Sequence, residues 1–411
     1  MSLSRLQISR VRNLRQVQLQ GLGQVNVFYG PNGSGKTSIL EAVHLLGMAR
    51  SFRGSSARSL ITHGTADCVV FGQVSSPAYP SPVPMGIQRD TTGDAQIKVG
   101  GTQLRSVAEL VEHLPVQVIN ADSFDLLTGA PGARRRYLDW GVFHVEHRFL
   151  EQCQRFQRCI KQRNKLLRHG KMRATELDVW TRDLAVSGAA LGEYRKAYFE
   201  QLAPRFVQII SRLAPALEGL ELRYQQGWDR SLDYASALEN AVEVDIEQGY
   251  THTGPQRADI KVMIKGRLAA ETLSRGQQKL VVCALKLAQG QLMSDQGKAR
   301  CVYLVDDLPS ELDEAHGARV CELLASMQAQ VFITCIEQAD IERLWPDSGG
   351  AQMAMFHVEQ GSVEAVIPGS VIPREGTPGE AAEPHVLANG RQLAAVAVPP
   401  AKYTNSSSIE K

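Results

Sequence analysis

Residues 30–37 combine glycines, a lysine and a threonine at a spacing suited to holding phosphate groups. The segment reads Gly-Pro-Asn-Gly-Ser-Gly-Lys-Thr and fits the pattern G-x-x-x-x-G-K-[ST]. Glycine lets backbone N–H groups curl around phosphate oxygens, and the start of a following helix adds partial positive charge. We expect Lys36 to reach the β- and γ-phosphates of a nucleoside triphosphate, and the Thr37 hydroxyl to bind Mg²⁺. The predicted nucleotide-binding residues of the loop are Gly30, Pro31, Asn32, Gly33, Ser34, Gly35, Lys36 and Thr37.

Two adjacent carboxylates follow an apolar run much later in the chain. Residues 301–305 (Cys-Val-Tyr-Leu-Val) have the length of a buried strand, and Asp306 and Asp307 come directly after them. A buried parallel strand that ends in two carboxylates is the second half of an ATPase site. We expect Asp306 to hold Mg²⁺ and Asp307 to orient the attacking water, with ATP and Mg²⁺ as cofactors.

A third segment, residues 273–279, opens a long helical stretch. Ser274 and Gln277 form an S-x-x-Q capping box, which by itself predicts only a well-capped helix. Gly276 in the first turn costs up to about 1 kcal/mol relative to alanine, so its presence suggests that a ligand approaches the backbone closely. Such a helix start is suited to receive a γ-phosphate. The residues concerned are Ser274, Arg275, Gly276 and Gln277.

Apolar runs and turn residues predict the elements that carry this chemistry. Residues 25–29 predict a strand before the phosphate loop, and residues 36–46 a helix after it. Residues 66–104 are rich in Gly, Pro and Thr and predict further β-structure. Residues 146–215 are poor in Gly and Pro and predict long helices. A helix of about 25 residues would extend roughly 37 Å, which is a short arm.

The composition is that of a globular protein without membrane spans. Of 411 residues, 43% are hydrophobic and 21% are charged, and no run approaches the roughly 20 apolar residues that cross a bilayer. The seven cysteines contain no C-x-x-C pair, which fits a reducing compartment. The first residues lack the apolar core of a signal peptide. We therefore expect a cytoplasmic protein with no membrane partner.

Charge is distributed unevenly along the chain. The net charge is only +2, which does not by itself predict nucleic-acid binding. Between residues 134 and 173, however, basic residues far outnumber acidic ones. Such a run indicates either a solvated helix face or a surface for phosphate backbones. The candidate DNA-binding residues are Arg134, Arg135, Arg136, Lys161 and Arg163.

The patterns predict four regions. The expected boundaries are 1–115 for the N-terminal part of an ATPase head, 116–250 for an inserted helical arm lobe, 251–368 for the C-terminal part of the head, and 369–411 for a disordered tail. The tail is predicted from its prolines, alanines and serine run.

The segments together resemble a known family. Residues 30–37, 273–279, 301–307 and 310–313 resemble, in this order, the Walker A, signature, Walker B and D-loop motifs of ATP-binding-cassette (ABC) ATPases of the SMC type. Stretches at 51–53, 132–140 and 254–259 resemble the RecF family of bacterial recombination mediators. The resemblance covers about residues 1–368. It implies an α/β fold, namely an ABC-type P-loop ATPase head with a mixed β-sheet plus an inserted, mainly helical lobe.

The resemblance also implies a function. RecF-like proteins are ATP-dependent homodimers in which the signature helix of one subunit covers the ATP of the other. They bind DNA at junctions between single strand and duplex and work with RecR and RecO. The expected function is an ATP-dependent, DNA-binding recombination mediator in DNA repair and replication, covering single-strand gap repair and SOS induction. Its weak, DNA-dependent hydrolysis would act as a switch that releases the dimer.

Two positions depart from the ABC ATPase pattern, and the same resemblance suggests roles for two further residues. Many cassette ATPases have Glu where Asp307 stands and a switch His near Thr334, so we expect slow turnover. Gln117 is the candidate for the Mg²⁺-linked glutamine. Arg53 either touches nucleotide phosphate or base, or is an ordinary surface arginine. Two other classes of protein share these motifs. One is the ATPase head of an SMC-like nuclease complex, which would carry a long coiled coil. The other is a transporter ATPase subunit, which would carry the switch histidine.

Overall fold

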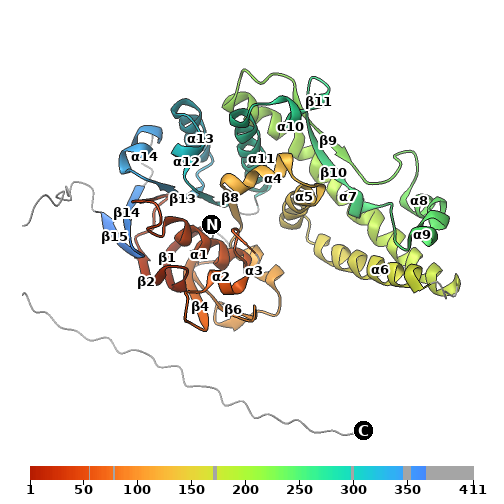
Figure 1. Cartoon of the computed structure of the whole chain (residues 1–411), viewed down its shortest axis with the longest axis horizontal. Helices are drawn as coiled ribbons and strands as arrows, with labels where there is room; N and C mark the ends of the chain where they lie inside the picture. The colour runs from red at the N-terminus through yellow and green to blue at the C-terminus, as the bar shows by residue number, and fades with distance from the viewer. Residues whose placement is uncertain (55, 77–78, 170–173, 298–299, 346–352, 367–411) are drawn as a thin grey trace, which may run out of the picture. The chain divides into compact units, whose positions relative to one another are not determined.

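The structure is a computed structural model that describes residues 1–366 apart from 55, 77–78, 170–173, 298–299 and 346–352 (Figure 1). The tail predicted to be disordered, residues 369–411, lies outside the described residues. Contacts between Cα atoms group residues 1–368 into one unit.

A six-stranded mixed sheet carries the phosphate loop and the paired carboxylates. Its strands, in spatial order, are β15 (Ser362–Val366), β14 (Met353–Glu359), β3 (Val25–Tyr29), β13 (Gln330–Cys335), β12 (Val302–Val305) and β8 (Val116–Ile119). All run parallel except β15. Strands β12 and β13 are buried at every position, which explains their unbroken apolar runs. Because parallel strands end at the same edge, the residues after β3 and β12 meet although the sequence separates them widely.

A second six-stranded sheet is antiparallel and forms the other side of the head. Its order is β2 (Leu14–Gln20), β1 (Ser2–Val11), β4 (Asp67–Ser75), β5 (Val83–Asp90), β6 (Ala95–Val99) and β7 (Thr102–Gln103). Burial alternates along β4, as expected of a sheet with one face on the core. Helix α1 (Lys36–Met48) contacts both sheets, and its buried residues Ile39 and Leu40 share one apolar cluster with Phe28 and Phe332.

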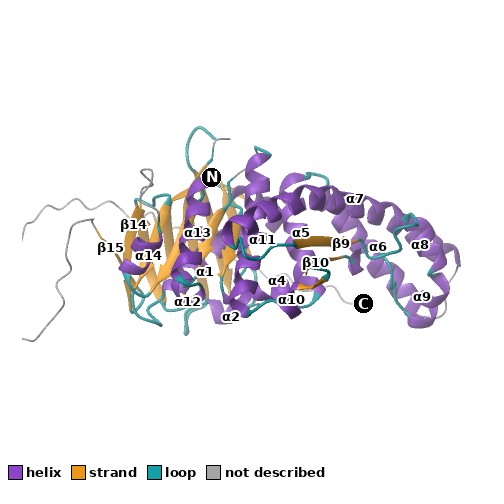
Figure 2. Cartoon of the chain, turned by 90° about the horizontal axis from the view of Figure 1, so that it is seen from above, coloured by secondary structure: helices purple, strands orange, loops and turns teal. Residues whose placement is uncertain are grey.

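Two long helices, α6 (Phe149–His169) and α7 (Ala174–Leu213), form where the low Gly and Pro content of residues 146–215 predicts them. Two further helices outside that range pack against α7, namely α5 (Pro131–Val145) and α11 (Arg275–Asp295). Figure 2 shows α6 and α7 side by side. Buried residues of α7 and α11 belong to one hydrophobic cluster. The length estimate of the arm is too short, since α7 has 40 residues and continues through Pro204. At 1.5 Å per residue it extends about 60 Å.

Strand pairing places two of the expected region boundaries differently. Strand β8 was assigned to the lobe by the boundary at 116, but it pairs with β12 in the head sheet. A third, three-stranded sheet joins β9 (Leu220–Gln225) to β10 (Asp259–Ile264) and β11 (Arg267–Leu268), so residues on both sides of position 251 pair with each other. The sequence did not reveal these pairings because their partners are remote along the chain.

Short elements complete the described fold. They are α2 (Ala57–Leu60), α3 (Val107–His113), η1 (Ala121–Phe124), α4 (Asp125–Thr128), α8 (Tyr234–Asn240), α9 (Val242–Gln248), η2 (Pro255–Arg257), α10 (Ala269–Thr272), α12 (Leu308–Glu311), α13 (Glu314–Ser326) and α14 (Gln338–Leu344). Within the residues that the structure describes, every helix is too short or too polar to cross a membrane.

Candidate nucleotide-binding site

The phosphate loop links the end of β3 to the first turn of α1. Gly30 has φ 147°, and a Cβ there would lie 2.2 Å from the carbonyl oxygen of Val358 in β14, so only glycine fits. The Lys36 side chain folds back over the loop, where its Nζ donates to the carbonyl oxygens of Gly30 at 2.6 Å and Pro31 at 2.9 Å. Burial lowers the pKa of Lys36, and the nearby Asp307 opposes that shift. The loop therefore holds a cation at its centre before any ligand binds.

Asn13 supports this loop from the turn between β1 and β2. Its Nδ2 donates to the carbonyl oxygen of Ser34 at 3.1 Å, and its Oδ1 accepts from the Ser38 hydroxyl at 3.0 Å. The Ser34 hydroxyl is buried and has no hydrogen-bond partner among the described residues. An unpaired hydroxyl inside a glycine-rich loop fits a phosphate oxygen as its partner. Sequence reasoning missed Asn13, since a turn asparagine gives no sign of a tertiary role.

The carboxylate of Asp306 meets the threonine of the loop. Its Oδ1 accepts from the Thr37 hydroxyl at 3.0 Å and from the Thr334 hydroxyl at 2.8 Å. Burial raises the pKa of Asp306 above its ordinary value, against the effect of these two hydrogen bonds. A desolvated carboxylate beside a threonine hydroxyl is a donor set that fits Mg²⁺.

Asp307 adopts a left-handed backbone with φ 54° and ψ 46°. Such a conformation is uncommon outside glycine and is often found at functional sites. It is fixed by a hydrogen bond of 2.8 Å from the Asp307 N–H to the Thr334 hydroxyl. Thr334 therefore contacts both aspartates from the end of β13, where the sequence showed only that no histidine is present.

A cavity of about 930 Å³ opens between these groups. Lys36, Thr37, Asp306 and Asp307 line it together with Arg53, which is exposed. Arg12, Arg58 and His63 also line it, and sequence reasoning missed all three.

The start of α11 does not line this cavity. Ser274 and Gln277 close the predicted capping box: the Ser274 Oγ accepts from the Gln277 N–H at 3.4 Å, and the Gln277 Oε1 accepts from the Ser274 N–H at 3.0 Å. Ser274, Arg275 and Gly276 are exposed. A Cβ at Gly276 would meet no atom within 4 Å. Nothing within the described protomer therefore explains why this position is glycine.

The assignment of Gln117 to the catalytic site is wrong. Its side chain is buried and donates through Nε2 to the Oε1 of Gln289 at 2.7 Å, away from the nucleotide cavity. The strand that carries it ends one residue before Asn120, and the Asp306 N–H donates to the carbonyl oxygen of Ile119 at 2.9 Å. Asn120 is therefore the polar residue of this segment that lies beside the carboxylate pair.

Part of the predicted DNA surface consists of paired arginines. The Arg134 guanidinium is bound by Asp259 at 2.7 Å and by the carbonyl oxygen of Gly129, and Arg135 donates to the carbonyl oxygen of Ala258 at 2.9 Å. These two side chains join α5 to Asp259 in β10 and to the residue before that strand, so the expectation of an open phosphate contact at Arg134 is wrong. Arg136 and Lys161 are exposed, and their contact with DNA stays a prediction.

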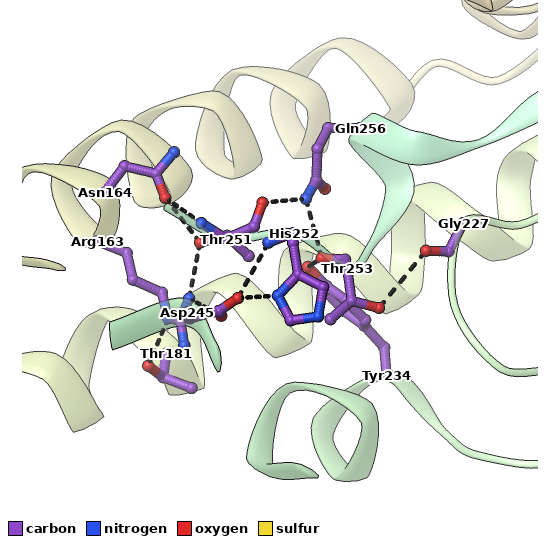
Figure 3. Close-up of polar contacts among 10 residues, drawn as sticks. All are labelled: Arg163, Asn164, Thr181, Gly227, Tyr234, Asp245, Thr251, His252, Thr253 and Gln256. Atoms are coloured by element: carbon purple, nitrogen blue, oxygen red, sulfur yellow. Dashed lines mark hydrogen bonds and ion pairs between the residues drawn. The ribbon is translucent and has the colours of Figure 1, made fainter. Parts of the chain in front are cut away.

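Arg163 is the clearest correction. Its side chain is 0% exposed and pairs with Asp245 at 2.5 Å. It also donates to the hydroxyls of Thr181 at 3.0 Å and Thr251 at 2.7 Å (Figure 3). The arginine joins α6, α7, α9 and the segment after α9 in one buried polar cluster. Because it is enclosed, it does not present its charge to DNA.

The sheet order, the phosphate loop and the carboxylates after β12 define an ABC-type ATPase head of the SMC class. Comparisons with known proteins agree. Residues 2–363 match the family described as RecF/RecN/SMC N terminal domain. The chain is 49% identical over 363 residues to the DNA replication and repair protein RecF of Pseudomonas fluorescens, covering 88% of this chain and 98% of that protein. It is 47% identical to the RecF of Stutzerimonas stutzeri, covering 88% and 97%.

Solved structures give the same result. The recombination mediator protein RecF with ATP, described as part of the RecFOR pathway, has a TM-score of 0.77 and 25% identity, with 89% of this chain and 97% of that one covered. An Smc head bound to the C-winged helix domain of ScpA has a TM-score of 0.55 at 15% identity, with coverage of 89% and 97%, and shows the shared fold. This chain belongs to the RecF family.

Proposed function

We propose that the chain is an ATP-dependent, DNA-binding recombination mediator of DNA repair and replication. The observation that carries this proposal is the separation of the two halves of a nucleotide site. The cavity at Lys36 and Asp306 contains the phosphate loop, whereas Gly276 lies at the exposed start of α11 and faces open space. Family membership supports the proposal, because curated relatives bear the name DNA replication and repair protein.

The proposed ligands of the cavity are ATP and Mg²⁺. Lys36 and the unpaired Ser34 hydroxyl are placed to receive phosphate oxygens, and Arg53 adds a cation on the cavity wall. Thr37 and Asp306 would hold the metal, which supplies charge neutralisation for the phosphates when bound. The ionised form of Asp306, which burial disfavours in the free protein, gains a cationic partner in this arrangement.

The proposed active form is a homodimer. Ser274, Arg275, Gly276 and Gln277 of one protomer would cover the nucleotide held by residues 30–37 of the other. A two-fold axis then gives two identical composite sites. The bare backbone at Gly276 and the exposed helix N-terminus are suited to contact a γ-phosphate from outside the protomer.

Hydrolysis in such a site is expected to be slow. Asp307 is one methylene shorter than glutamate, and the neighbouring Thr334 hydroxyl is already committed to Asp306 and to the Asp307 N–H. The shorter Asp307 side chain therefore reaches less far toward the attacking water, and the Thr334 hydroxyl has no free donor with which to orient it. Hydrolysis would therefore act as a timer that opens the dimer and releases DNA.

DNA is the proposed macromolecular ligand, at junctions between single strand and duplex. Exposed cations that support it are Arg136 on α5 and Lys161 and Arg168 on α6. RecR and RecO are the proposed protein partners. The proposed processes are single-strand gap repair and SOS induction, and the proposed location is the cytoplasm. Membership of the RecF family supports these proposals.

Affinity for gapped, duplex and single-stranded DNA, measured by fluorescence anisotropy with and without ATP and Mg²⁺, tests the proposal. We expect gapped DNA to bind most tightly, and only with ATP. Lys36→Ala should remove the effect of ATP, whereas Lys98→Ala, at an exposed position on β6, should retain it. Equal affinity with and without ATP in the unaltered chain would contradict the proposal.

A further inference from the structure

A second cavity, of about 540 Å³, is lined by four cationic side chains from separate parts of the chain. Arg50 follows α1, Arg89 lies on β5, Arg136 on α5 and Lys286 on α11. This cavity shares no lining residue with the nucleotide cavity. Cations brought together from distant segments indicate a built site.

Among the described residues, no carboxylate pairs with any of these four charges. The Lys286 ammonium forms no hydrogen bond or ion pair with any described residue. The Arg89 Nη1 donates to the carbonyl oxygen of Ala49, but the buried Arg89 Nε has no partner among the described residues. Two carboxylates, Asp122 and Asp125, also line the cavity, and in the described structure neither pairs with one of the four cations.

The cations also disfavour one another. Burial lowers the pKa of Lys286 to about 8, with a further contribution from Arg50. Burial likewise lowers the pKa of Arg50, and Arg136 adds to that shift. Arg89 and Lys286 are half-buried, whereas Arg50 and Arg136 are exposed at the mouth of the cavity. Collecting unneutralised cations in such a partly enclosed space is unfavourable, and a bound anion relieves it. The cavity is therefore poised to bind negative charge.

We propose that this second cavity binds a phosphate dianion. Four positive and two negative side chains leave two positive charges (4 − 2 = 2), which matches a phosphate monoester. Three guanidinium groups and an ammonium offer more donors than a carboxylate can accept, whereas three phosphate oxygens can use them. The phosphate belongs either to free inorganic phosphate or to the terminal phosphate of a nucleic-acid strand. The inference does not depend on the proposed ATP site, because the residues of the nucleotide cavity take no part in it; Arg136 is shared with the proposed DNA surface.

Calorimetric titration with inorganic phosphate and pyrophosphate tests the site directly. The Lys36→Ala chain, without Mg²⁺, is used so that the nucleotide loop does not bind the probe. We expect one binding event, weakened at least tenfold by adding Lys286→Gln or Arg50→Gln. Lys196→Gln, which removes an exposed cation of α7 outside this cavity, is the matched control and should leave affinity unchanged.

Thermal unfolding provides an independent readout. Without phosphate, Lys286→Gln should unfold at a higher temperature than the parent, since one repelling charge is gone. Phosphate should then stabilise the parent and leave the variant unchanged. Oligonucleotides with a 5′-phosphate or a 5′-hydroxyl separate the two sources: a preference for the phosphorylated strand that Lys286→Gln abolishes assigns a strand end, and equal binding of the strands assigns free phosphate. Phosphate binding that survives both Lys286→Gln and Arg50→Gln, or its absence from the Lys36→Ala chain, overturns the proposal.

Discussion

The Thr37 hydroxyl donates a 3.0 Å hydrogen bond to the Oδ1 of Asp306 across a separation of 269 residues. This contact joins the helix that follows the phosphate loop to the residue that follows β12. It exists because β3 and β12 lie in one sheet and end at the same edge. Both halves of the proposed metal site are therefore formed before a nucleotide arrives.

Asp306→Asn should stabilise the free protein and abolish Mg²⁺-dependent nucleotide binding. The pKa of Asp306 is raised by burial, so its ionised form costs stability above its ordinary pKa, and an amide removes that cost while still accepting from Thr37 and Thr334. Relief of this kind is commonly worth about 0.5–2 kcal/mol. Urea unfolding of the unliganded proteins measures the gain, and a fluorescent ATP analogue measures the lost binding. A less stable variant would contradict the role of burial.

Arg163→Met should destabilise the fold by about 3–5 kcal/mol, because it removes the guanidinium that pairs with the buried Asp245 carboxylate and leaves His252 as the remaining partner of that carboxylate. Urea unfolding measures the loss. Adding Asp245→Leu should recover part of it, since the buried carboxylate that lost its guanidinium is then removed, although His252 also loses its acceptor. Lys161→Gln on the same helix is the exposed control and should change stability by less than about 0.5 kcal/mol. A stable Arg163→Met chain with weaker DNA binding would instead support the original surface role of Arg163.

Stability should fall as pH drops from 6.5 toward 5 because the buried His44 and the half-buried His144 stay neutral in the folded protein. Burial lowers the pKa of both His44 and His144 to about 4, whereas the unfolded chain takes up the protons near pH 6.5. Each histidine then removes up to about 1.4 kcal/mol of stability per pH unit, a limit approached as the pH falls well below 6.5. His144 packs against Trp140 and Phe143, and its Nε2 has no partner in the described structure. His144→Phe should therefore remove the contribution of this histidine to the slope of unfolding free energy against pH. An unchanged slope, measured by urea unfolding at each pH, would count against this account.

The sequence predicted those parts of the site that depend on local pattern. The phosphate loop and the strand before Asp306 follow from motif and apolar run, and the capping box at Ser274 follows from spacing alone. The sequence could not assign Arg163, because a run of cations does not say which of them faces a partner such as Asp245, 82 residues away. Gln117 was misplaced for a similar reason: every position of a short buried strand reads alike, and only the packing of α11 shows that it meets Gln289. Asn13 and Thr334 act through contacts that the fold creates.

The central claim is that a second copy of the chain completes the nucleotide site. Substitution of Gly276 tests this claim. Since a Cβ there meets no atom within 4 Å, Gly276→Glu should leave the protomer folded and able to bind ATP, and the new charge should repel a nucleotide only in the dimer. Val207→Glu, an equivalent charge on an exposed position of α7, is the control and should dimerise normally.

Mixing Lys36→Ala with Gly276→Glu chains tests this claim most directly, with ATP-dependent dimerisation and hydrolysis as the readouts. Each variant alone should neither dimerise with ATP nor hydrolyse it. Together they should form mixed dimers in which one composite site has both an intact loop and an intact signature, giving about half of the wild-type rate per protomer. A mixture no more active than the two variants measured separately, or a Gly276→Glu chain that dimerises like the Val207→Glu control, would show that the site is complete within one chain.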